Sequence, residues 1–463
     1  MLTIHRTERE FDHLGEFFDL IGPERTRRLH DAAAEIARRL DGGTLWHVNS
    51  TAAGGGVAEM LHILLPLYRS LGVRAGWLVV GGDGRFFEVT KRLGTALYGS
   101  PGDGGPLGPA EQTAYLDVLS ANAGETRELL GRRDILLLHD HQTAGLVEIL
   151  GGEVSAVYWR CHVGVDEEGP ASDAAWDFLA PFLSGARGLV FSVPWHVPRR
   201  LGDHRVEVVP PFVSPFSAKN RVLNEGDVRT CLAHCGLSAP TAGPPARGPL
   251  RALRHPVRLV AEGTPNPGEP SLVQVSRWDR LKDMDGVLAA FAAHVEKGYL
   301  TLAGPDPLGI QDDVEQGVWF DRCLAAWREL PPATRRRVGL LCLPMADLEE
   351  NALLVNALQR SADVVVQKSL AEGFGLTVTE AMWKSRVVVA SAVGGIREQI
   401  THGENGLLVA DPADLSGFGT LLARVAAGEV DTGGMGARAR LKVLRDFLPD
   451  REVIGTARLL DDR

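Results

Sequence analysis

Short apolar runs alternate with segments of helical periodicity from about residue 43 onward. The clearest helix is predicted between Val57 and Leu71, where apolar residues recur every three to four positions. Short apolar runs between such helices are typical of buried strands in a parallel sheet. The pattern predicts one doubly wound α/β unit with strands at 44–49, 75–80, 134–139, 154–161, 188–193 and 205–209.

The alternation stops between Gly236 and Pro270, where eight prolines occur and no apolar period is evident. Such a composition is typical of a linker or a surface insertion. The alternation then resumes, with predicted strands at 272–276, 300–303, 338–343, 363–367 and 387–390, and the chain ends in a helical pattern. We therefore predict an N-terminal domain over 1–235, a linker or insertion over 236–270, a second domain over 271–436 and a C-terminal helical segment over 437–463.

The predicted fold class is α/β, with two doubly wound Rossmann-like domains that face an interdomain cleft. Open sheets of this kind bind ligands outside the carboxyl ends of their strands, and a cleft between domains is the usual place for a site. Polar residues that directly follow the predicted strands are therefore the candidates for function.

Composition and charge narrow the class of protein. The chain of 463 residues has a net charge of −10 and no Lys/Arg block, which argues against a nucleic-acid partner. Its most apolar runs, at 61–68 and 387–393, are far shorter than the ~20 residues that span a bilayer. The first residues do not resemble a secretory signal, so we expect a cytoplasmic protein without an integral membrane segment. Five cysteines without a CxxC pair indicate neither a disulfide framework nor a zinc site.

A glycine-rich turn follows the first predicted strand. Gly54, Gly55 and Gly56 separate Asn49 from the amphipathic helix. The backbone N–H groups of such a turn, together with the helix N-terminus, favour an anion. The spacing matches neither GxGxxG nor a Walker loop. A plain strand-to-helix turn is an equal alternative.

Polar side chains also follow two later strands of this half. His139, Asp140 and His141 follow one of them, and His162 follows the next. Asp140 could accept hydrogen bonds from a hydroxylated substrate and His162 could donate one, whereas a helix cap and a buried core histidine are the structural alternatives. The two histidines around Asp140 could suggest a metal. Because neighbouring side chains of a strand point to opposite faces and no further ligand is evident, we predict no metal site.

Two cations follow the first predicted strand of the C-terminal half. Arg277 comes directly after the strand and Lys282 five residues later, so both can converge on one diphosphate. Either one alone would be typical of a solvated surface charge. Asp283 and Asp285 formally match a DxD metal motif, but they open a predicted helix, where acidic residues are favoured by the helix dipole.

The strongest motif runs from Glu372 to Met382. Gly373 and Gly375 make its first part a loop that leads into a helix, so Glu372 is expected in the loop and Glu380 on the first turns of the helix. This arrangement offers backbone N–H groups for a phosphate and two carboxylates that accept hydrogen bonds from sugar hydroxyls.

The pairs Arg277…Lys282 and Glu372…Glu380 resemble the donor-site signature of retaining GT-B glycosyltransferases. More narrowly, the chain from about residue 17 to 409 is similar to the trehalose glycosyltransferring synthases. The similar segments are HVNSTAAGGGVAEML at 47–61, HDHQTAGL at 139–146, WRCH at 159–162, NALQRSADVVVQKSLAEGFGLTVTEAMWK at 356–384 and GENGLLV at 403–409.

The resemblance implies the GT-B architecture and a retaining hexosyltransferase that needs no metal, no cofactor and no dedicated protein base. A phosphate oxygen of the leaving group would take the acceptor proton, and the new bond would form on the face that the leaving group vacates. The implied catalytic residues are His162, Arg277, Lys282 and Glu372. The implied donor-binding residues are Gly55, Gly56, Arg277, Lys282, Glu372, Gly373, Phe374, Gly375, Leu376 and Glu380, and the implied acceptor-binding residues are Asp140, His141 and Asn49.

Within these sets the resemblance implies more specific roles. Arg277 and Lys282 would neutralise the diphosphate, and Glu380 would hold the ribose. Glu372 would bind the donor sugar, and His162 would lie near the anomeric carbon and the primary hydroxyl of that sugar.

The chain departs from the family pattern in the half that normally selects the acceptor. His141 stands where a proline is expected, Ser214 replaces an aspartate, and the segment 163–170 differs. The leading hypothesis is transfer of glucose from a nucleotide-activated donor to free glucose, which gives trehalose. The sequence leaves the oligomeric state open, and a homodimer is one of the possibilities. The alternatives are the same transfer to a specialised-metabolite sugar or aminocyclitol, a trehalose phosphorylase and, in different classes, a nucleotide-sugar epimerase or a non-catalytic nucleotide-sugar binder.

Overall fold

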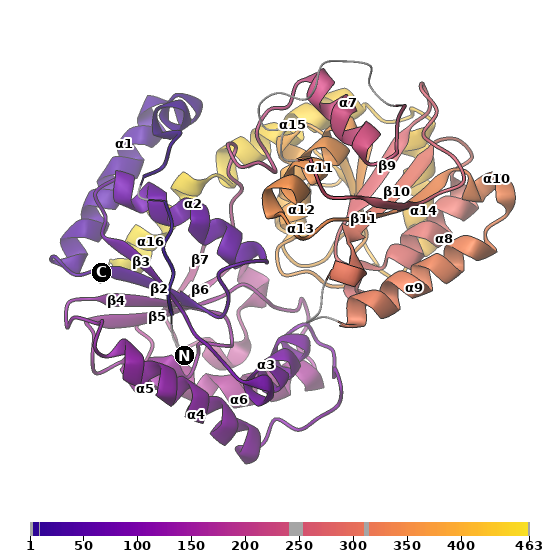
Figure 1. Cartoon of the computed structure of the whole chain (residues 1–463). Coiled ribbons are helices and arrows are strands. Elements are labelled where there is room, and N and C mark those ends of the chain that lie inside the picture. Colours follow the sequence, from indigo (N-terminus) through magenta and orange to yellow (C-terminus); the bar gives the residue numbers. More distant parts are fainter. Residues whose placement is uncertain (1–2, 9, 240–252, 310–313, 462–463) are drawn as a thin grey trace. The chain divides into compact units, whose positions relative to one another are not determined.

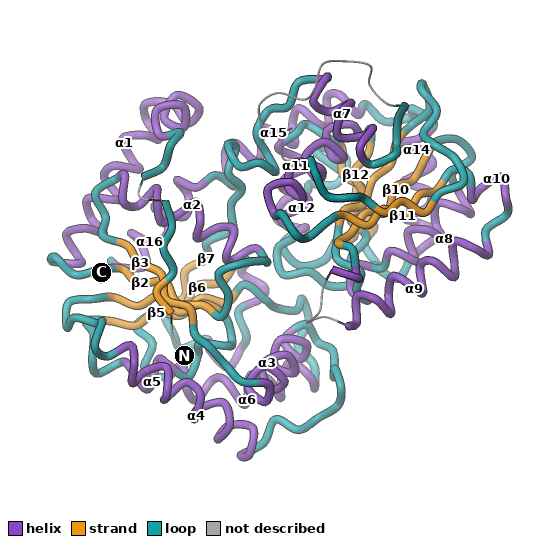
Figure 2. The backbone as a smooth tube through the Cα atoms, in the orientation of Figure 1, coloured by secondary structure: helices purple, strands orange, loops and turns teal. Residues whose placement is uncertain are grey.

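The computed structural model describes residues 3–8, 10–239, 253–309 and 314–461 (Figure 1). Contacts divide the chain into two compact units. The first comprises Met1–Val213, Glu372–Phe374 and Phe447–Arg463, and the second comprises Ser214–Ala371 and Gly375–Asp446. Figure 2 shows that the strands of each unit form a central sheet with helices on both faces.

The first unit is built on a sheet with the strand order β1-β3-β2-β4-β5-β6-β7. Only β1 is antiparallel to its neighbour among these strands. Helices cover both faces, which explains why most of the strands read as continuous apolar runs. The strands are β1 (Thr3–Ile4), β2 (Leu45–Asn49), β3 (Ala75–Val79), β4 (Ile135–His139), β5 (Ala156–Cys161), β6 (Gly188–Phe191) and β7 (Val206–Val208).

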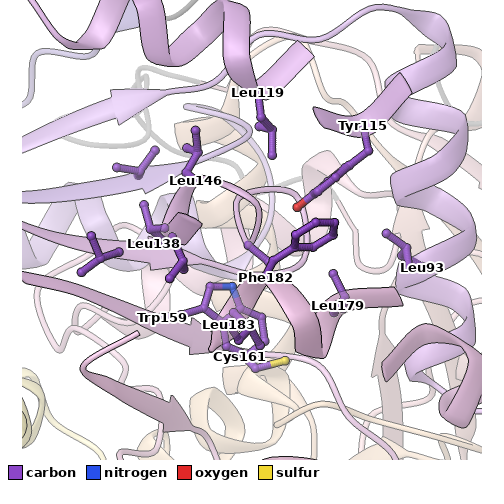
Figure 3. Packing of buried hydrophobic residues seen from close by; sticks show 14 of the residues in the cluster. Leu93, Tyr115, Leu119, Leu138, Leu146, Trp159, Cys161, Leu179, Phe182 and Leu183 are labelled. Carbon is purple, nitrogen blue, oxygen red and sulfur yellow. The ribbon is translucent and has the colours of Figure 1, made fainter. Parts of the chain in front are cut away.

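Two layers of helices enclose this sheet (Figure 1). One layer holds α1 (Leu14–Leu40), α2 (Gly56–Ser70) and α16 (Pro449–Leu460), which contact one another. The other holds α3 (Gly84–Leu97), α4 (Pro109–Thr126), α5 (Leu146–Leu150) and α6 (Pro170–Leu183). Figure 3 shows the core beneath the second layer, where Tyr115 and Phe182 pack with residues of β4 and β5 such as Leu138 and Trp159.

The second unit has the strand order β14-β13-β12-β9-β10-β11-β8, with β8 antiparallel to β11 and the other neighbours parallel. Its six parallel strands follow the Rossmann order 3-2-1-4-5-6 read from β11. The strands are β8 (Arg258–Val260), β9 (Ser271–Val275), β10 (Tyr299–Pro305), β11 (Val338–Leu343), β12 (Val364–Gln367), β13 (Val387–Ser391) and β14 (Leu407–Val409).

Helices also cover both faces of the second sheet (Figure 1). On one face lie α8 (Met284–His294), α9 (Val314–Glu329) and α14 (Leu415–Ala426). On the other face lie α7 (Glu225–His234), α11 (Leu348–Ser361) and α12 (Leu376–Trp383), with α15 (Thr432–Asp446) against α12. The shorter helices of this unit include α10 (Pro332–Arg335) and α13 (Ile396–Gln399).

The α/β class with two doubly wound units is confirmed, and each predicted strand is present with small shifts at its ends. The strands β1, β8 and β14, which have two or three residues each, were not predicted. The chain passes from the first compact unit to the second after Val213, whereas the predicted boundary was at residue 235. Part of the predicted linker, the segment 253–270, contains strand β8. The rest of the predicted linker, at 240–252, lies outside the described residues.

The C-terminal helical pattern resolves into two helices with different places. The helix α15 belongs to the second unit, whereas α16 packs against α1 and α2 of the first. Among the helices of the described ranges, none is long and apolar enough to cross a bilayer.

Candidate active site

The first sheet reverses its strand order at β2, which lies between β3 and β4. Ligands of open α/β sheets bind outside the carboxyl ends of the strands at such a point. His47 lies in β2 and His139 ends β4, while Asp140 and His162 directly follow β4 and β5. The fold thus brings Asp140, predicted to bind the acceptor, and His162, predicted to be catalytic, to the carboxyl ends of neighbouring strands.

Three histidines of neighbouring strands form a hydrogen-bonded chain at this edge. The Nδ1 atom of His47 lies 3.0 Å from Nε2 of His139, and Nδ1 of His139 lies 3.0 Å from Nε2 of His162. His47 and His139 are buried, and His162 is partly exposed. Sequence reasoning assigned no role to the first two, because only pairing of the strands brings the rings together.

The surroundings disfavour protonation of all three rings. Desolvation lowers the pKa of His47 to about 3 and holds the pKa values of His139 and His162 well below the usual value. The guanidinium of Arg160 acts on each ring in the same direction. The histidine chain is therefore neutral at neutral pH.

Asp140 has a backbone conformation that is uncommon for a residue other than glycine, with φ at 61°. Its Oδ1 accepts a hydrogen bond of 2.7 Å from the backbone N–H of His162, and its carbonyl oxygen accepts one of 2.9 Å from the Trp159 indole. Desolvation raises the pKa of Asp140 to about 6, although the His162 N–H opposes this shift. Backbone strain and a raised pKa are both typical of functional sites.

Asn49 and His141 occupy different settings from those expected for acceptor-binding residues. Asn49 Nδ2 donates to the Thr51 carbonyl at 2.7 Å, and its Oδ1 accepts from the Trp77 indole at 2.7 Å. His141 is buried, and a Cβ on Gly94 of α3 would lie 3.0 Å from its ring. Both polar groups of the Asn49 amide are therefore engaged by the protein, whereas the buried Nδ1 of His141 has no hydrogen-bond partner among the described residues.

The glycine-rich turn has the geometry expected of an anion-binding loop. Gly54 and Gly55 have φ values of 75° and 83°, which side chains rarely allow. Gly56 then begins α2, whose first turn has no side-chain cap in this described segment. The turn is exposed, so its backbone N–H groups and the helix dipole are available to an anion.

The segment Glu372–Phe374 groups with the first unit. A Cβ on Gly373 would lie only 2.5 Å from the carbonyl oxygen of His162, so glycine permits this close approach. Phe374 packs edge-on against Phe447, with ring centroids 5.4 Å apart. The structure therefore brings the loop that carries Glu372 next to His162.

The second sheet reverses its strand order between β9 and β12. Arg277 and Lys282 lie in the connection from β9 to α8. Asp279 organises this loop, because its Oδ1 accepts from the backbone N–H of Lys282 at 3.2 Å and its Oδ2 lies 3.0 Å from Nη2 of Arg277. Both predicted phosphate-binding cations thus come from one ordered loop at the carboxyl end of β9.

Strand β12 fixes the other end of that loop. Lys368 directly follows β12, is buried, and pairs with Asp283, whose φ is 45°. Gln274 of β9 donates to the carbonyl of Lys282 at 2.8 Å. Asp285 pairs with Arg322 at 2.7 Å, so both carboxylates of the DxD sequence engage cationic side chains of the protein.

Glu380 lies on α12, which begins after Gly375 with its φ of 84°. The side chain of Glu380 is buried, and its Oε1 lies 3.5 Å from Nζ of Lys219. Lys384, one turn further on, donates from its buried Nζ to Asn220 Oδ1 at 2.9 Å and to Gln359 Oε1 at 2.8 Å. Burial lowers the pKa of Lys384, and the Glu380 carboxylate opposes this effect.

A buried ion pair lies close to the histidine chain. Arg160 of β5 and Glu452 of α16 are both buried and form a hydrogen-bonded pair, and Arg160 Nη2 also donates to the Val209 carbonyl at 3.0 Å. No sequence pattern indicates this pair, because its members are 292 positions apart in the chain. It anchors α16 to the central sheet of the first unit.

The chain matches two family models, described as "Trehalose synthase, N-terminal domain" over residues 47–198 and "Glycosyl transferases group 1" over residues 269–423. The trehalose synthase of Pyrococcus horikoshii is 32% identical, with 94% of this chain and 92% of the relative covered. The trehalose synthase of Thermococcus litoralis is 33% identical, with 88% and 87% covered. The chain belongs to the trehalose synthase family.

This membership makes the protein a glycosyltransferase, and solved structures confirm the GT-B fold. The trehalose-phosphate synthase of Burkholderia vietnamiensis superposes with a TM-score of 0.64 at 16% identity, covering 89% of this chain and 97% of the other. Anabaena HepE in complex with UDP-glucose gives a TM-score of 0.60 at 15% identity, covering 89% and 98%.

A trehalose phosphorylase of Pleurotus pulmonarius is a more distant relative of this trehalose synthase family member. It is 24% identical, and the match covers 78% of this chain and 49% of the phosphorylase.

Proposed function

We propose that this member of the trehalose synthase family transfers glucose from a nucleotide-activated donor to free glucose and forms trehalose. The observation that carries the proposal is the likeness to trehalose synthases at 32–33% identity, which extends over most of the chain. The site residues of both units support it, because they include cations for a diphosphate and hydrogen-bonding groups for sugars.

In the donor half, Arg277 and Lys282 bind the diphosphate. The backbone of their loop is held by Asp279, by Gln274 and by the Lys368–Asp283 pair. The carboxylate of Glu380 accepts hydrogen bonds from the ribose hydroxyls. The amides from Phe374 to Leu376 contact the donor sugar at the start of α12.

In the first unit, Glu372 and His162 bind the hydroxyls of the transferred sugar, and Asp140 orients the acceptor. Gly55 and Gly56 add backbone N–H groups for the diphosphate. The close approach of Gly373 to His162 supports a shared role for these two segments.

The reaction breaks the bond between the anomeric carbon and the diphosphate oxygen and forms a bond to the acceptor oxygen with retained configuration. Negative charge develops on the leaving diphosphate, and the fixed cations Arg277 and Lys282 stabilise it. A phosphate oxygen takes the acceptor proton, so the chain supplies no separate base. These two cations also provide the charge that a metal supplies in other transferases.

Trehalose phosphorylase is the weaker alternative, because the match to such an enzyme is 24% identical and covers about half of its length. Phosphate-dependent release of glucose from trehalose without a nucleotide would distinguish it.

Product analysis tests the proposal. The purified protein is incubated with UDP-, ADP- and GDP-glucose in turn, each with and without glucose, and the products are separated by chromatography. We expect trehalose only where a donor and glucose are both present. Donor consumption without trehalose would contradict glucose as the acceptor, and trehalose cleavage by phosphate alone would contradict the transferase.

A substitution at Glu372 tests the assigned donor site. Glu372→Gln keeps the size of the side chain and removes its charge, so we expect the turnover number to fall by about two orders of magnitude or more. The melting temperature is the control, because the side chain is partly exposed and its loss should change stability little. Near-normal turnover would remove Glu372 from the mechanism.

A further inference from the structure

The histidine chain crosses three adjacent strands of the first sheet, since β2 pairs with β4 and β4 pairs with β5. Neighbouring rings of the chain are close to parallel and meet edge to edge, with centroids 5.3 Å apart in both pairs and interplanar angles of 22° and 15°. His47 is the buried end of the chain, His139 is its centre, and His162 is the end assigned to the donor sugar. Nothing in the proposed reaction uses His47 or His139 directly.

A neutral imidazole has one ring nitrogen that donates a hydrogen bond and one that accepts. Both ring nitrogens of His139 are engaged, Nε2 with His47 and Nδ1 with His162. His139 therefore donates to one neighbour and accepts from the other. The chain of donors must run either from His47 to His162 or in the opposite direction.

The buried end decides between these directions. His47 Nε2 is buried and has no hydrogen-bond partner among the described residues. If the chain ran from His162 to His47, this nitrogen would carry a buried proton without an acceptor. If it runs from His47 to His162, the nitrogen is a bare acceptor, and buried groups that lack a partner are more often acceptors than N–H donors.

We propose that His47 and His139 are positioning residues that hold His162 as the tautomer with its proton on Nδ1. His47 Nδ1–H donates to His139 Nε2, and His139 Nδ1–H donates to His162 Nε2. The remaining nitrogen of His162, Nδ1, then presents an N–H group to a hydroxyl oxygen of the donor sugar. This role rests on the proposed function, in which His162 contacts that sugar.

The fixed tautomer also has a chemical consequence. With Nε2 occupied by the bond from His139 and Nδ1 protonated, His162 has no lone pair with which to take the acceptor proton. The ring stabilises the bound sugar as a donor only. The proton is left to the phosphate oxygen, as the proposed mechanism requires.

Nitrogen NMR of the substrate-free protein tests the tautomers directly. The full chain is labelled with ring-¹⁵N histidine, and the three rings are assigned by comparison with His47→Asn, His139→Gln and His162→Asn. We expect a protonated Nδ1 and a bare Nε2 on all three rings. A proton on Nε2 of His162, or a mixture of its tautomers, would overturn the proposal.

Two substitutions at His47 test the positioning role. His47→Asn keeps an amide donor near the place of Nδ1, whereas His47→Leu removes the donor at similar size. We expect His162 in the Leu variant to become a mixture of tautomers and kcat/KM to fall roughly tenfold, as is typical when a supporting hydrogen bond is lost. The Asn variant should keep the His162 tautomer and lose no more than about threefold.

Several outcomes separate this proposal from the function it rests on. Equal turnover in the Leu and wild-type proteins, or an unchanged His162 tautomer in a folded Leu variant, would overturn the positioning role. If the wild-type protein forms no trehalose from any nucleotide-glucose donor, the proposed function fails, and the NMR spectrum of the free protein still decides the direction of the histidine chain.

Discussion

Three parts of His162 contact the rest of the protein: its backbone N–H, its ring and its carbonyl oxygen. Its backbone N–H donates to Asp140, its ring bonds to His139, and its carbonyl oxygen faces Gly373. At the scale of single residues, the residues that make these contacts with His162 therefore tolerate few substitutions.

Gly373→Ala is expected to lower both stability and activity. The added Cβ would lie 2.5 Å from the His162 carbonyl oxygen, and a backbone atom cannot move aside as a flexible side chain can. Overpacking of this kind costs about 1–3 kcal/mol of unfolding free energy. Denaturant unfolding and trehalose formation measure the two effects.

Gly124→Ala is the matched control for this change. Gly124 lies within α4, where an added Cβ meets nothing within 4 Å. Alanine is a better helix former than glycine, so we expect stability to stay equal or to rise by up to about 1 kcal/mol. Similar losses in both variants would contradict the close approach of Gly373 to His162.

Asp140→Asn tests the raised pKa of Asp140. Because the pKa is about 6 in the folded protein and lower in the unfolded chain, the ionised carboxylate destabilises the fold as the pH rises through this interval. Asparagine does not ionise and tolerates a positive φ. The unfolding free energy of the variant relative to wild type should therefore rise between about pH 4 and pH 6 and level off above that range.

Urea unfolding at several pH values measures this difference. A stability difference that does not depend on pH would contradict the raised pKa. The same variant should lose turnover above about pH 6, where the wild-type side chain is ionised, because the neutral amide binds an acceptor hydroxyl more weakly than a carboxylate does.

At the scale of elements, the loop between β9 and α8 shows how strands position a charge. Strand β9 contributes Gln274, the turn contributes Asp279, and the residue after β12 contributes Lys368. All three act on the backbone or the flanks of the Lys282 segment. Two adjacent strands thus hold this loop at the carboxyl edge of the sheet.

Lys368→Met is expected to destabilise the second unit by about 3 kcal/mol, because it leaves Asp283 without its buried cationic partner. The double variant Lys368→Met with Asp283→Asn should recover part of that loss, since no buried charge remains uncompensated. Denaturant unfolding of the wild type, the two single variants and the double variant gives the coupling energy. Strictly additive losses would contradict a stabilising pair.

Sequence patterns could predict some strands and candidate site residues but not others. The strands β4 and β11 are continuous apolar runs and are recognisable without a structure, whereas β8 and β14 have only three residues each. Arg277 and Lys282 could be proposed from the sequence because they follow a recognisable strand, and Glu372 because it lies in a glycine-containing motif. His47 and Lys368 were missed, because their roles depend on hydrogen bonds and ion pairs with residues distant in sequence.

At the scale of the whole molecule, the chain returns to its first unit after it has built the second. Helix α16 belongs to the first unit and brings Glu452 to Arg160 of β5. The periodicity of the last segment predicted helices, but it could not say where they pack. That choice depends on the buried charge of Arg160, which needs a partner from another element.

The two cations of the proposed diphosphate site make a metal ion unnecessary for the proposed reaction. Because the proposed diphosphate site relies on Arg277 and Lys282, EDTA should leave the rate of trehalose formation unchanged, and added Mg²⁺ should not raise it. A loss of activity in EDTA that Mg²⁺ restores would contradict this assignment of charge.

The most direct test of the central claim follows the acceptor carbon atoms. The protein is incubated with ¹³C-glucose and unlabelled nucleotide-glucose, and the product is analysed by NMR. The account predicts α,α-trehalose with the label in one of its two rings and one nucleoside diphosphate released per disaccharide. An unlabelled product, a label in both rings, or a disaccharide with a different linkage would contradict it.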